Sequence, residues 1–100
     1  MSKGRVITAR SAGVVVGYLL FVFNDSPFYE EKICTVGMYY LQRTHRKVGV
    51  GKRMFLLLEQ LAKEAGCKQI VVSYNLKQPL ESFYNGLGFS ATHVALAKEI

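Results

Sequence analysis

A basic turn with two glycines is the segment whose residue types and spacing best suit chemistry. It covers residues 46–51, reads RKVGVG, and lies between an apolar run and an amphipathic helical pattern. Glycine lets a ligand come close to the backbone. The first N–H groups of a helix have no partner within the helix, so they can donate to phosphate oxygens, and the helix dipole favours the same anion. The turn therefore predicts a pyrophosphate site, with a plain tight turn as the alternative.

Two other phosphate-binding motifs do not fit this turn. A P-loop requires glycine at position 46 and Ser or Thr at position 53, and the chain has Arg46 and Arg53 there. A dinucleotide-binding fingerprint requires Gly or Ala at position 54, where the chain has Met54. The motif is therefore neither of these.

The charge of the chain is concentrated at the same turn. The net charge is +6, and the eleven residues 43–53 contain no acid and five basic residues: Arg43, Arg46, Lys47, Lys52 and Arg53. Such a patch indicates a nucleic-acid or phosphate partner, although a basic run is more often only a solvated surface. Nucleic acid is disfavoured, because the patch lacks interleaved aromatic residues and that partner would leave the glycines unexplained.

The elements that position this turn follow from the hydrophobic pattern. Strands are predicted at 5–12, 14–23, 32–42, 69–74 and from 89 onward, and helices at 50–65 and 79–87. The first helix is predicted to bury a stripe formed by Val50, Met54, Leu57, Leu58, Leu61 and Ala65. The order β-β-β-α-β-α-β predicts an α/β fold with a mixed sheet, in which three antiparallel strands lead into a parallel strand–helix–strand unit.

Two segments on these elements carry a family resemblance. The pattern Arg46-x-x-Gly49-x-Gly51 resembles the RxxGxG signature of the GNAT superfamily of acetyl-CoA-dependent N-acetyltransferases. Residues 83–89, FYNGLGF, resemble the FYxxLGF helix end of the same family. The gap between the two motifs fits one helix, one strand and one loop, and the resemblance covers about residues 14–98.

The resemblance implies acetyl-CoA as the cosubstrate, with no metal. It places the pyrophosphate on backbone amides from Val48 to Lys52, within the set Arg46, Lys47, Val48, Gly49, Val50, Gly51 and Lys52. The pantetheine arm would pair with main-chain groups near Tyr39 and Leu41, where the third strand splays from the fourth. Asn75 would bond a pantetheine amide, although its spacing to Tyr84 is about two residues longer than is usual in the family.

Tyr84 is the expected catalytic residue. In the family's arrangement its hydroxyl would lie near the sulfur and return a proton to the leaving thiolate. A phenol suits this role because a free alkyl thiol has a pKa near 8.5. The alternative is that Tyr84 only packs in the core, but Phe83 beside it already supplies a packing residue.

The sequence also departs from the family pattern. A full GNAT domain begins with another strand and two helices that shape the acceptor site, whereas only residues 1–4 precede the first predicted strand here. The usual Pro-Glu pair before the signature is replaced by Arg43 and Thr44. No general base stands out, and the candidates are Glu30, Glu31, Tyr40 and His45.

Two functions follow from these observations. The first is an N-acetyltransferase that transfers an acetyl group from acetyl-CoA to a primary amine. The alternative is a catalytically inactive module that binds acyl-CoA or acts as a structural or interaction protein, which the short N-terminal region favours.

Composition sets the remaining expectations. Residues 1–100 form a single domain, half of it apolar, and the longest apolar run, 14–23, is too short for a membrane helix. Cys34 and Cys67 have no zinc-ligand spacing, so reduced thiols in the cytoplasm are expected. With few residues before the first strand, part of the sheet should lack cover, which predicts a homodimer. The alternative is that the chain is a fragment whose missing segment is normally attached.

Overall fold

The computed structural model describes residues 4–26, 30–46, 49–73, 80–92 and 96–100. Its elements, in chain order, are the strands and helices β1 (Gly4–Ser11), β2 (Val14–Asp25), β3 (Lys32–Leu41), the 3-10 turn η1 (Arg43–His45), α1 (Val50–Glu64), β4 (Gln69–Val71) and α2 (Glu81–Gly86). The order matches the predicted elements as far as α2, but β4 is shorter than the predicted 69–74, because Val72 and Ser73 are not in a strand, and α2 begins at Glu81 rather than at 79.

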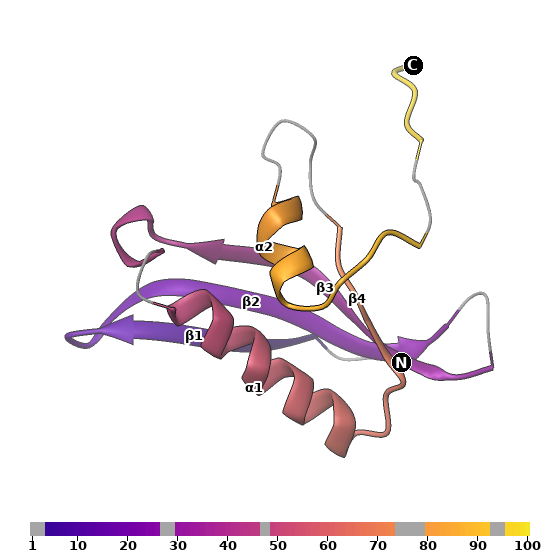
Figure 1. The fold of residues 1–100 in the computed structure, drawn as a ribbon, viewed down its shortest axis with the longest axis horizontal. Helices are drawn as coiled ribbons and strands as arrows, with labels where there is room; N and C mark the ends of the chain where they lie inside the picture. The colour runs from indigo at the N-terminus through magenta and orange to yellow at the C-terminus, as the bar shows by residue number, and fades with distance from the viewer. Residues whose placement is uncertain (1–3, 27–29, 47–48, 74–79, 93–95) are drawn as a thin grey trace.

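The four strands form one mixed sheet in the order β1-β2-β3-β4 (Figure 1). β1, β2 and β3 are antiparallel neighbours, whereas β3 and β4 run parallel on either side of α1 in sequence. Short hairpin connections join antiparallel strands, whereas the parallel pair β3 and β4 requires a crossover, which α1 supplies. The predicted α/β topology is confirmed.

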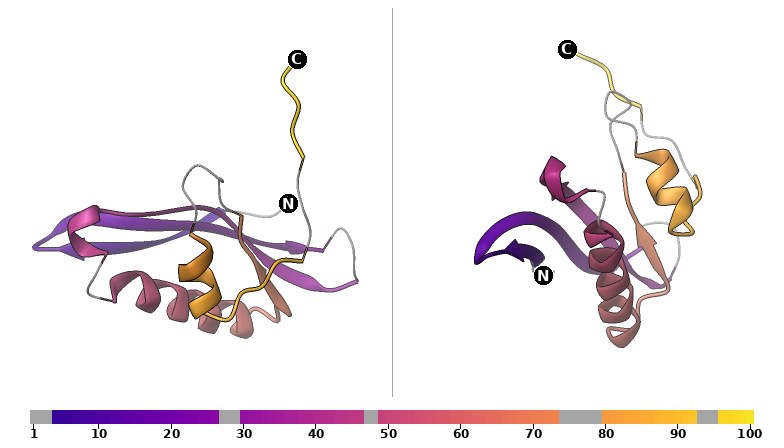
Figure 2. Two further views of the ribbon diagram at one scale, coloured as in Figure 1. Left: turned by 45° about the horizontal axis from the view of Figure 1, so that its top comes forward. Right: turned by 60° about the vertical axis from the view of Figure 1, so that its left-hand side comes forward.

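One face of the sheet forms the core. Side chains alternate between faces along a strand, so Leu19 and Phe21 of β2 share a face with Ile7 of β1 and with Cys34 and Val36 of β3. α1 lies across this face, and α2 lies beside α1 (Figure 2). Burial of these apolar side chains fixes the position of α1 relative to β3.

The opposite face of the sheet, here called the open face, has no helix against it in the described part of the chain (Figure 2). It is formed by side chains that alternate with those of the core, in rows of register partners. Its large exposed residues are Val6 at 54%, Leu20 at 39%, Met38 at 51% and Tyr40 at 45%. Tyr18 joins them, with its ring centroid 5.6 Å from that of Tyr40.

The buried stripe of α1 differs from the predicted one. It consists of Gly51, Met54, Phe55, Leu58 and Ala62. Leu57, predicted to be buried, is 45% exposed. Phe55 occupies the core position instead, because the aromatic side chains of β3 and α2 gather around it.

The final predicted strand is wrong for the described residues. Residues 89–92 and 96–100 have no strand structure, and Leu96 and Ile100 are almost fully exposed. Figure 1 shows the C-terminal segment extending away from the sheet. β4 has only three paired residues, so it presents too short an edge for a fifth strand to pair with.

Candidate functional site

The turn between β3 and α1 presents an open helix N-terminus. Gly49 is the N-cap of α1 and has a φ of 78°, a conformation that glycine adopts without steric cost. Among the described residues no side chain caps this end, and the first turn of the helix contains no acidic residue. A Cβ placed at Gly49 would meet nothing within 4 Å. A ligand can therefore approach the backbone closely at Gly49.

Gly51 has a different environment. It is buried, and a Cβ there would collide with the hydroxyl of Tyr39 and lie 3.3 Å from Cζ of Phe83. The space next to its Cα is therefore filled by the protein itself. The two glycines of the motif have separate surroundings, one open to solvent and one packed.

Aromatic packing holds the Tyr39 side chain in place. Its ring stacks on Phe83 with a centroid separation of 5.7 Å and an interplanar angle of 4°, and it meets Phe55 edge-on at 5.1 Å. Burial raises the pKa of the Tyr39 hydroxyl above its ordinary 10.0, and the positive charge of Arg46 partly opposes this shift. Tyr39 is therefore neutral at pH 7.

The edge of β3 is unpaired next to this turn. β3 pairs with β4 only from Ile33 to Thr35, and it then continues to Leu41 without a partner strand on that side among the described residues. The pairing therefore ends at Thr35, four residues before Tyr39, the first of the two positions where the sequence predicts a splay. Free main-chain groups on such an edge can pair with an extended amide-containing ligand.

Arg46 links the turn to the end of that edge. Its Nε donates a 2.7 Å hydrogen bond to the carbonyl of Leu41. The cationic side chain thus lies against β3. The Leu41 carbonyl, one of the predicted pantetheine contacts, already accepts one hydrogen bond from Arg46.

Tyr84 lies in the same aromatic cluster. It is only 4% exposed and makes edge-on ring contacts with Phe55 and Phe89 at centroid distances of 5.6 and 5.5 Å. Burial, and to a smaller extent the neighbouring Tyr39, raise the pKa of Tyr84 from 10.0 to about 12. The hydroxyl is therefore protonated at neutral pH, as a proton donor must be.

The remaining predicted site residues fall into two groups. Lys47, Val48 and Asn75 lie outside the described residues. The four candidate bases are not gathered around Tyr84: Tyr40 lies on the open face, and the ring Nδ1 of His45 lies 3.0 Å from the hydroxyl of Thr44.

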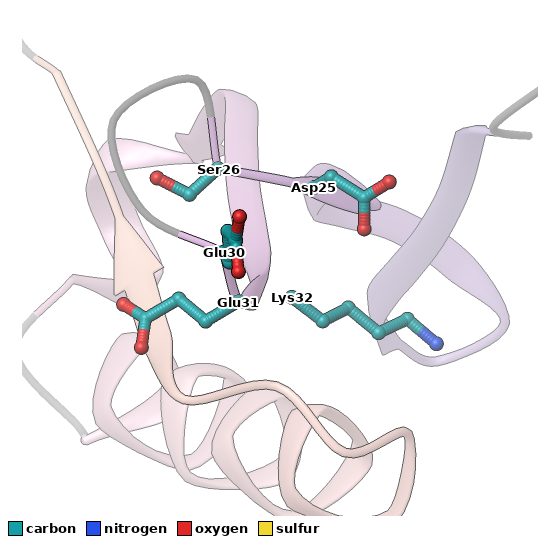
Figure 3. Close-up of a pocket in the computed structure, with 5 residues that line it drawn as sticks. All are labelled: Asp25, Ser26, Glu30, Glu31 and Lys32. Carbon is teal, nitrogen blue, oxygen red and sulfur yellow. The ribbon is translucent and has the colours of Figure 1, made fainter.

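Glu30 and Glu31 line a shallow hollow at the opposite end of β3 (Figure 3). The hollow has a volume of about 460 Å³, and its other lining residues are Asp25, Ser26 and Lys32. In Figure 3 the side chains spread to both sides of the hairpin rather than converging on one point. Within the described ranges no three His, Cys, Asp or Glu residues come together as a metal site.

Sequence reasoning missed the side chains of Tyr39, Phe55 and Phe83. Only the main chain of Tyr39 was assigned a role, and Phe83 was treated as packing alone. No spacing in the sequence links a strand residue to two helices, so only the fold brings these three rings together.

A comparison with protein families points to the same family as the sequence motif. The chain matches the profile described as "Acetyltransferase (GNAT) family" over residues 2–89. The chain belongs to the GNAT acetyltransferase family. A comparison with curated protein sequences finds no match.

Solved structures share this GNAT fold at low sequence identity. A putative acetyl transferase from Pyrococcus furiosus has a TM-score of 0.90 and 21% identity over 98% of this chain and 66% of its own. A ribosomal-protein-alanine N-acetyltransferase from Brucella melitensis has a TM-score of 0.82 and 20% identity over 97% of this chain and 71% of its own. An aminoglycoside N-acetyltransferase solved in complex with CoA has a TM-score of 0.83 and 14% identity over 95% and 74%.

The chain thus spans slightly less than two thirds of the length of the Pyrococcus protein. These likenesses show the fold. Neither helix of the described structure is long and apolar enough to cross a lipid bilayer.

Proposed function

We propose that this GNAT chain is an N-acetyltransferase that transfers an acetyl group from acetyl-CoA to a primary amine. The observation that carries the proposal is the continuity between two features: the unpaired edge of β3 ends at Leu41, and the open N-terminus of α1 begins at Gly49. A ligand with an amide-containing arm and a pyrophosphate would use both features at once.

The pyrophosphate of acetyl-CoA would lie at the α1 N-terminus. The amides from Gly49 to Lys52 are the described groups that would donate to it, and Arg43, Lys52 and Arg53 supply positive charge. The open space at Gly49 fits such a ligand, because nothing there obstructs the approach of phosphate oxygens.

The pantetheine arm would pair with the free main-chain groups of β3 between Val36 and Leu41. This pairing would direct the thioester toward the aromatic cluster that contains Tyr39 and Tyr84. The amine nitrogen then attacks the carbonyl carbon and releases one proton to solvent, the C–S bond breaks, and the coenzyme A thiolate leaves with the bonding electrons.

Tyr84 is the proposed proton donor to that thiolate. A phenol with a pKa of about 12 is a weaker acid than an alkyl thiol in water, whose pKa is near 8.5. A thiolate formed in the same desolvated cluster would also be destabilised, because burial disfavours the charged form of a thiol. This effect would bring the two acidities closer together, which favours proton transfer.

A second function has one specific observation in its favour. Tyr84 is buried under aromatic rings, as a residue with a purely structural role would be. The chain would then bind acyl-CoA without turning it over, and act as a structural or interaction module.

Release of the coenzyme A thiol tests the proposal and separates the two functions. The chain is incubated with acetyl-CoA and a panel of primary amines, and isothermal titration with acetyl-CoA and with a DNA oligonucleotide is run in parallel. Amine-dependent thiol release supports the transferase, and acetyl-CoA binding without release supports the inactive module. Binding to DNA alone would contradict both.

We also propose that the protein self-associates as a homodimer through the open face. The exposed side chains of Val6, Leu20, Met38 and Tyr40 are uncharged, so they form an apolar surface on which a second copy of this chain could dock. The two free cysteines favour a reducing location such as the cytoplasm.

A further inference from the structure

We propose that Tyr39 is a positioning residue that fixes the start of α1, and that residue 51 is glycine to admit its hydroxyl. This inference rests on the proposed function, because the element that Tyr39 positions is the proposed pyrophosphate site. It assigns the two glycines of the motif different tasks: Gly49 leaves room for the ligand, and Gly51 leaves room for a side chain of the protein.

The contact between Tyr39 and Gly51 is the basis of this assignment. Gly51 lies in the first turn of α1, and the Tyr39 hydroxyl occupies the space that a Cβ at this position would need. The hydroxyl therefore marks how closely the first turn of the helix can approach β3. A residue two positions past the N-cap sets the direction of the amides on either side of it.

Tyr39 cannot easily move away from this contact. A terminal hydroxyl usually yields to a new methyl group by side-chain rotation. Here the ring is held against Phe83, nearly parallel to it, and meets Phe55 edge-on. Gly51 is also within reach of Phe83, so the same ring blocks the other side. A side chain at position 51 must therefore displace the start of the helix rather than Tyr39.

The other end of the turn is held by the same strand. Arg46 donates to the carbonyl of Leu41, two residues after Tyr39. β3 thus contacts the turn both before and after Gly49, through Arg46 on one side and Tyr39 on the other. The start of α1 is therefore held by Tyr39 at Gly51, and a helix start held in this way would lower the ordering cost of anion binding.

A double-mutant cycle between Tyr39 and Gly51 tests the inference. Gly51→Ala should weaken acetyl-CoA binding by about tenfold or more, since contacting residues commonly couple by this amount. Tyr39→Phe keeps the ring and should weaken binding by only about two- to threefold. In the double variant the new methyl group takes the space of the lost hydroxyl, so binding should recover to near the Tyr39→Phe value.

Gly49→Ala is the matched control. It also adds one methyl group to the motif, but it strains a positive φ and faces open space. Gly49→Ala should weaken acetyl-CoA binding by the same factor in the wild-type background and in the Tyr39→Phe background. Additive losses in the Tyr39/Gly51 cycle, or a double variant no better than Gly51→Ala, would overturn the inference.

Thermal unfolding without ligand provides a second readout of the same cycle. Gly51→Ala should lower the melting temperature, even though alanine favours helices over glycine, and Tyr39→Phe should restore it. If the wild type fails to bind acetyl-CoA, the proposed function fails, yet coupling in the melting temperatures would still confirm the contact. If wild type binds and neither readout couples, only the positioning role is refuted.

Discussion

The Nε atom of Arg46 donates a 2.7 Å hydrogen bond to the carbonyl oxygen of Leu41, five residues earlier in the chain. This bond ties Arg46, which directly follows η1, back to the end of β3. It gives the arginine of the motif a structural task in addition to its charge. The turn that carries the proposed pyrophosphate site is therefore held by one of its own basic residues.

Arg46→Ala should weaken acetyl-CoA binding by about tenfold, because it removes both a charge-assisted hydrogen bond and a positive charge near the site. Arg46→Lys keeps the charge but loses the planar donor that reaches Leu41. Isothermal titration should place the lysine variant between wild type and the alanine variant. A lysine variant equal to wild type would mean that only the charge of Arg46 matters.

Gly49→Asp should abolish acetyl-CoA binding, because it places a side chain and a negative charge where the pyrophosphate would lie. Gly66→Asp is the matched control, since Gly66 also has a positive φ and an open Cβ position but lies beyond the other end of α1. Both variants should remain folded by circular dichroism. Equal affinities for the two would refute the site assignment.

Tyr84→Phe should preserve the fold and acetyl-CoA affinity but lower turnover by about 10²–10⁴-fold, the usual loss for one proton donor. Tyr18→Phe serves as a control, because the Tyr18 hydroxyl contacts the sulfur of Met38 on the open face. Steady-state rates at saturating acetyl-CoA make the comparison. If the Tyr84→Phe variant turns over as fast as wild type, Tyr84 is not the proton donor and its role is to pack in the core.

Alkaline pH should destabilise the fold. Burial raises the pKa of Tyr84 from 10.0 to about 12 and that of Cys34 from 9.0 to about 11. The unfolded chain therefore releases these protons first, so stability is full below about pH 9 and falls as pH rises toward 12. Each group contributes about 3 kcal/mol to the free energy of unfolding, and this contribution is lost once the pH exceeds both of its pKa values. The figure follows because one pKa unit corresponds to about 1.4 kcal/mol.

Urea unfolding between pH 7 and pH 12 measures this loss. Tyr84→Phe cannot titrate at position 84, so its free energy of unfolding should fall less steeply above pH 10 than that of wild type. Identical slopes for the two proteins would contradict the assignment to Tyr84.

Met38→Lys should shift the protein toward monomer, because it buries a charge in the proposed interface on the open face. Leu57→Lys is the control: Leu57 is 45% exposed but lies on α1, away from the sheet surface. Sedimentation equilibrium at micromolar concentration compares them with wild type. A monomeric wild type would refute the dimer, and dissociation by Leu57→Lys alone would move the interface to α1.

The sequence predicts the fold well where the hydrophobic pattern is strong. The continuous apolar run of β2 and the helical repeat of α1 place both elements to within two residues at each end. The predicted stripe of α1 is wrong at Leu57, because the buried face is centred on Gly51, Leu58 and Ala62. Phe55 lies on that face, four residues after Gly51, and Leu57 does not.

The site was predictable in its backbone but not in its side chains. Gly49 at a strand-to-helix turn requires only local reasoning, since its positive φ is a property of the turn. The space beside Gly51 is filled by Tyr39, twelve residues away, and that contact depends on how β3 packs against α1. The predicted final strand is absent over the described residues 89–92 and 96–100 for a similar reason, because strand pairing depends on the partner edge, and β4 has only three paired residues.

A titration of the isotope-labelled protein with acetyl-CoA, followed by backbone amide NMR, tests the central claim most directly. The account predicts the largest shifts at the amides from Gly49 to Lys52, with smaller shifts along β3 from Val36 to Leu41, and little change at Gly66. An absence of shifts, or shifts confined to the hollow between Asp25 and Lys32, would contradict it.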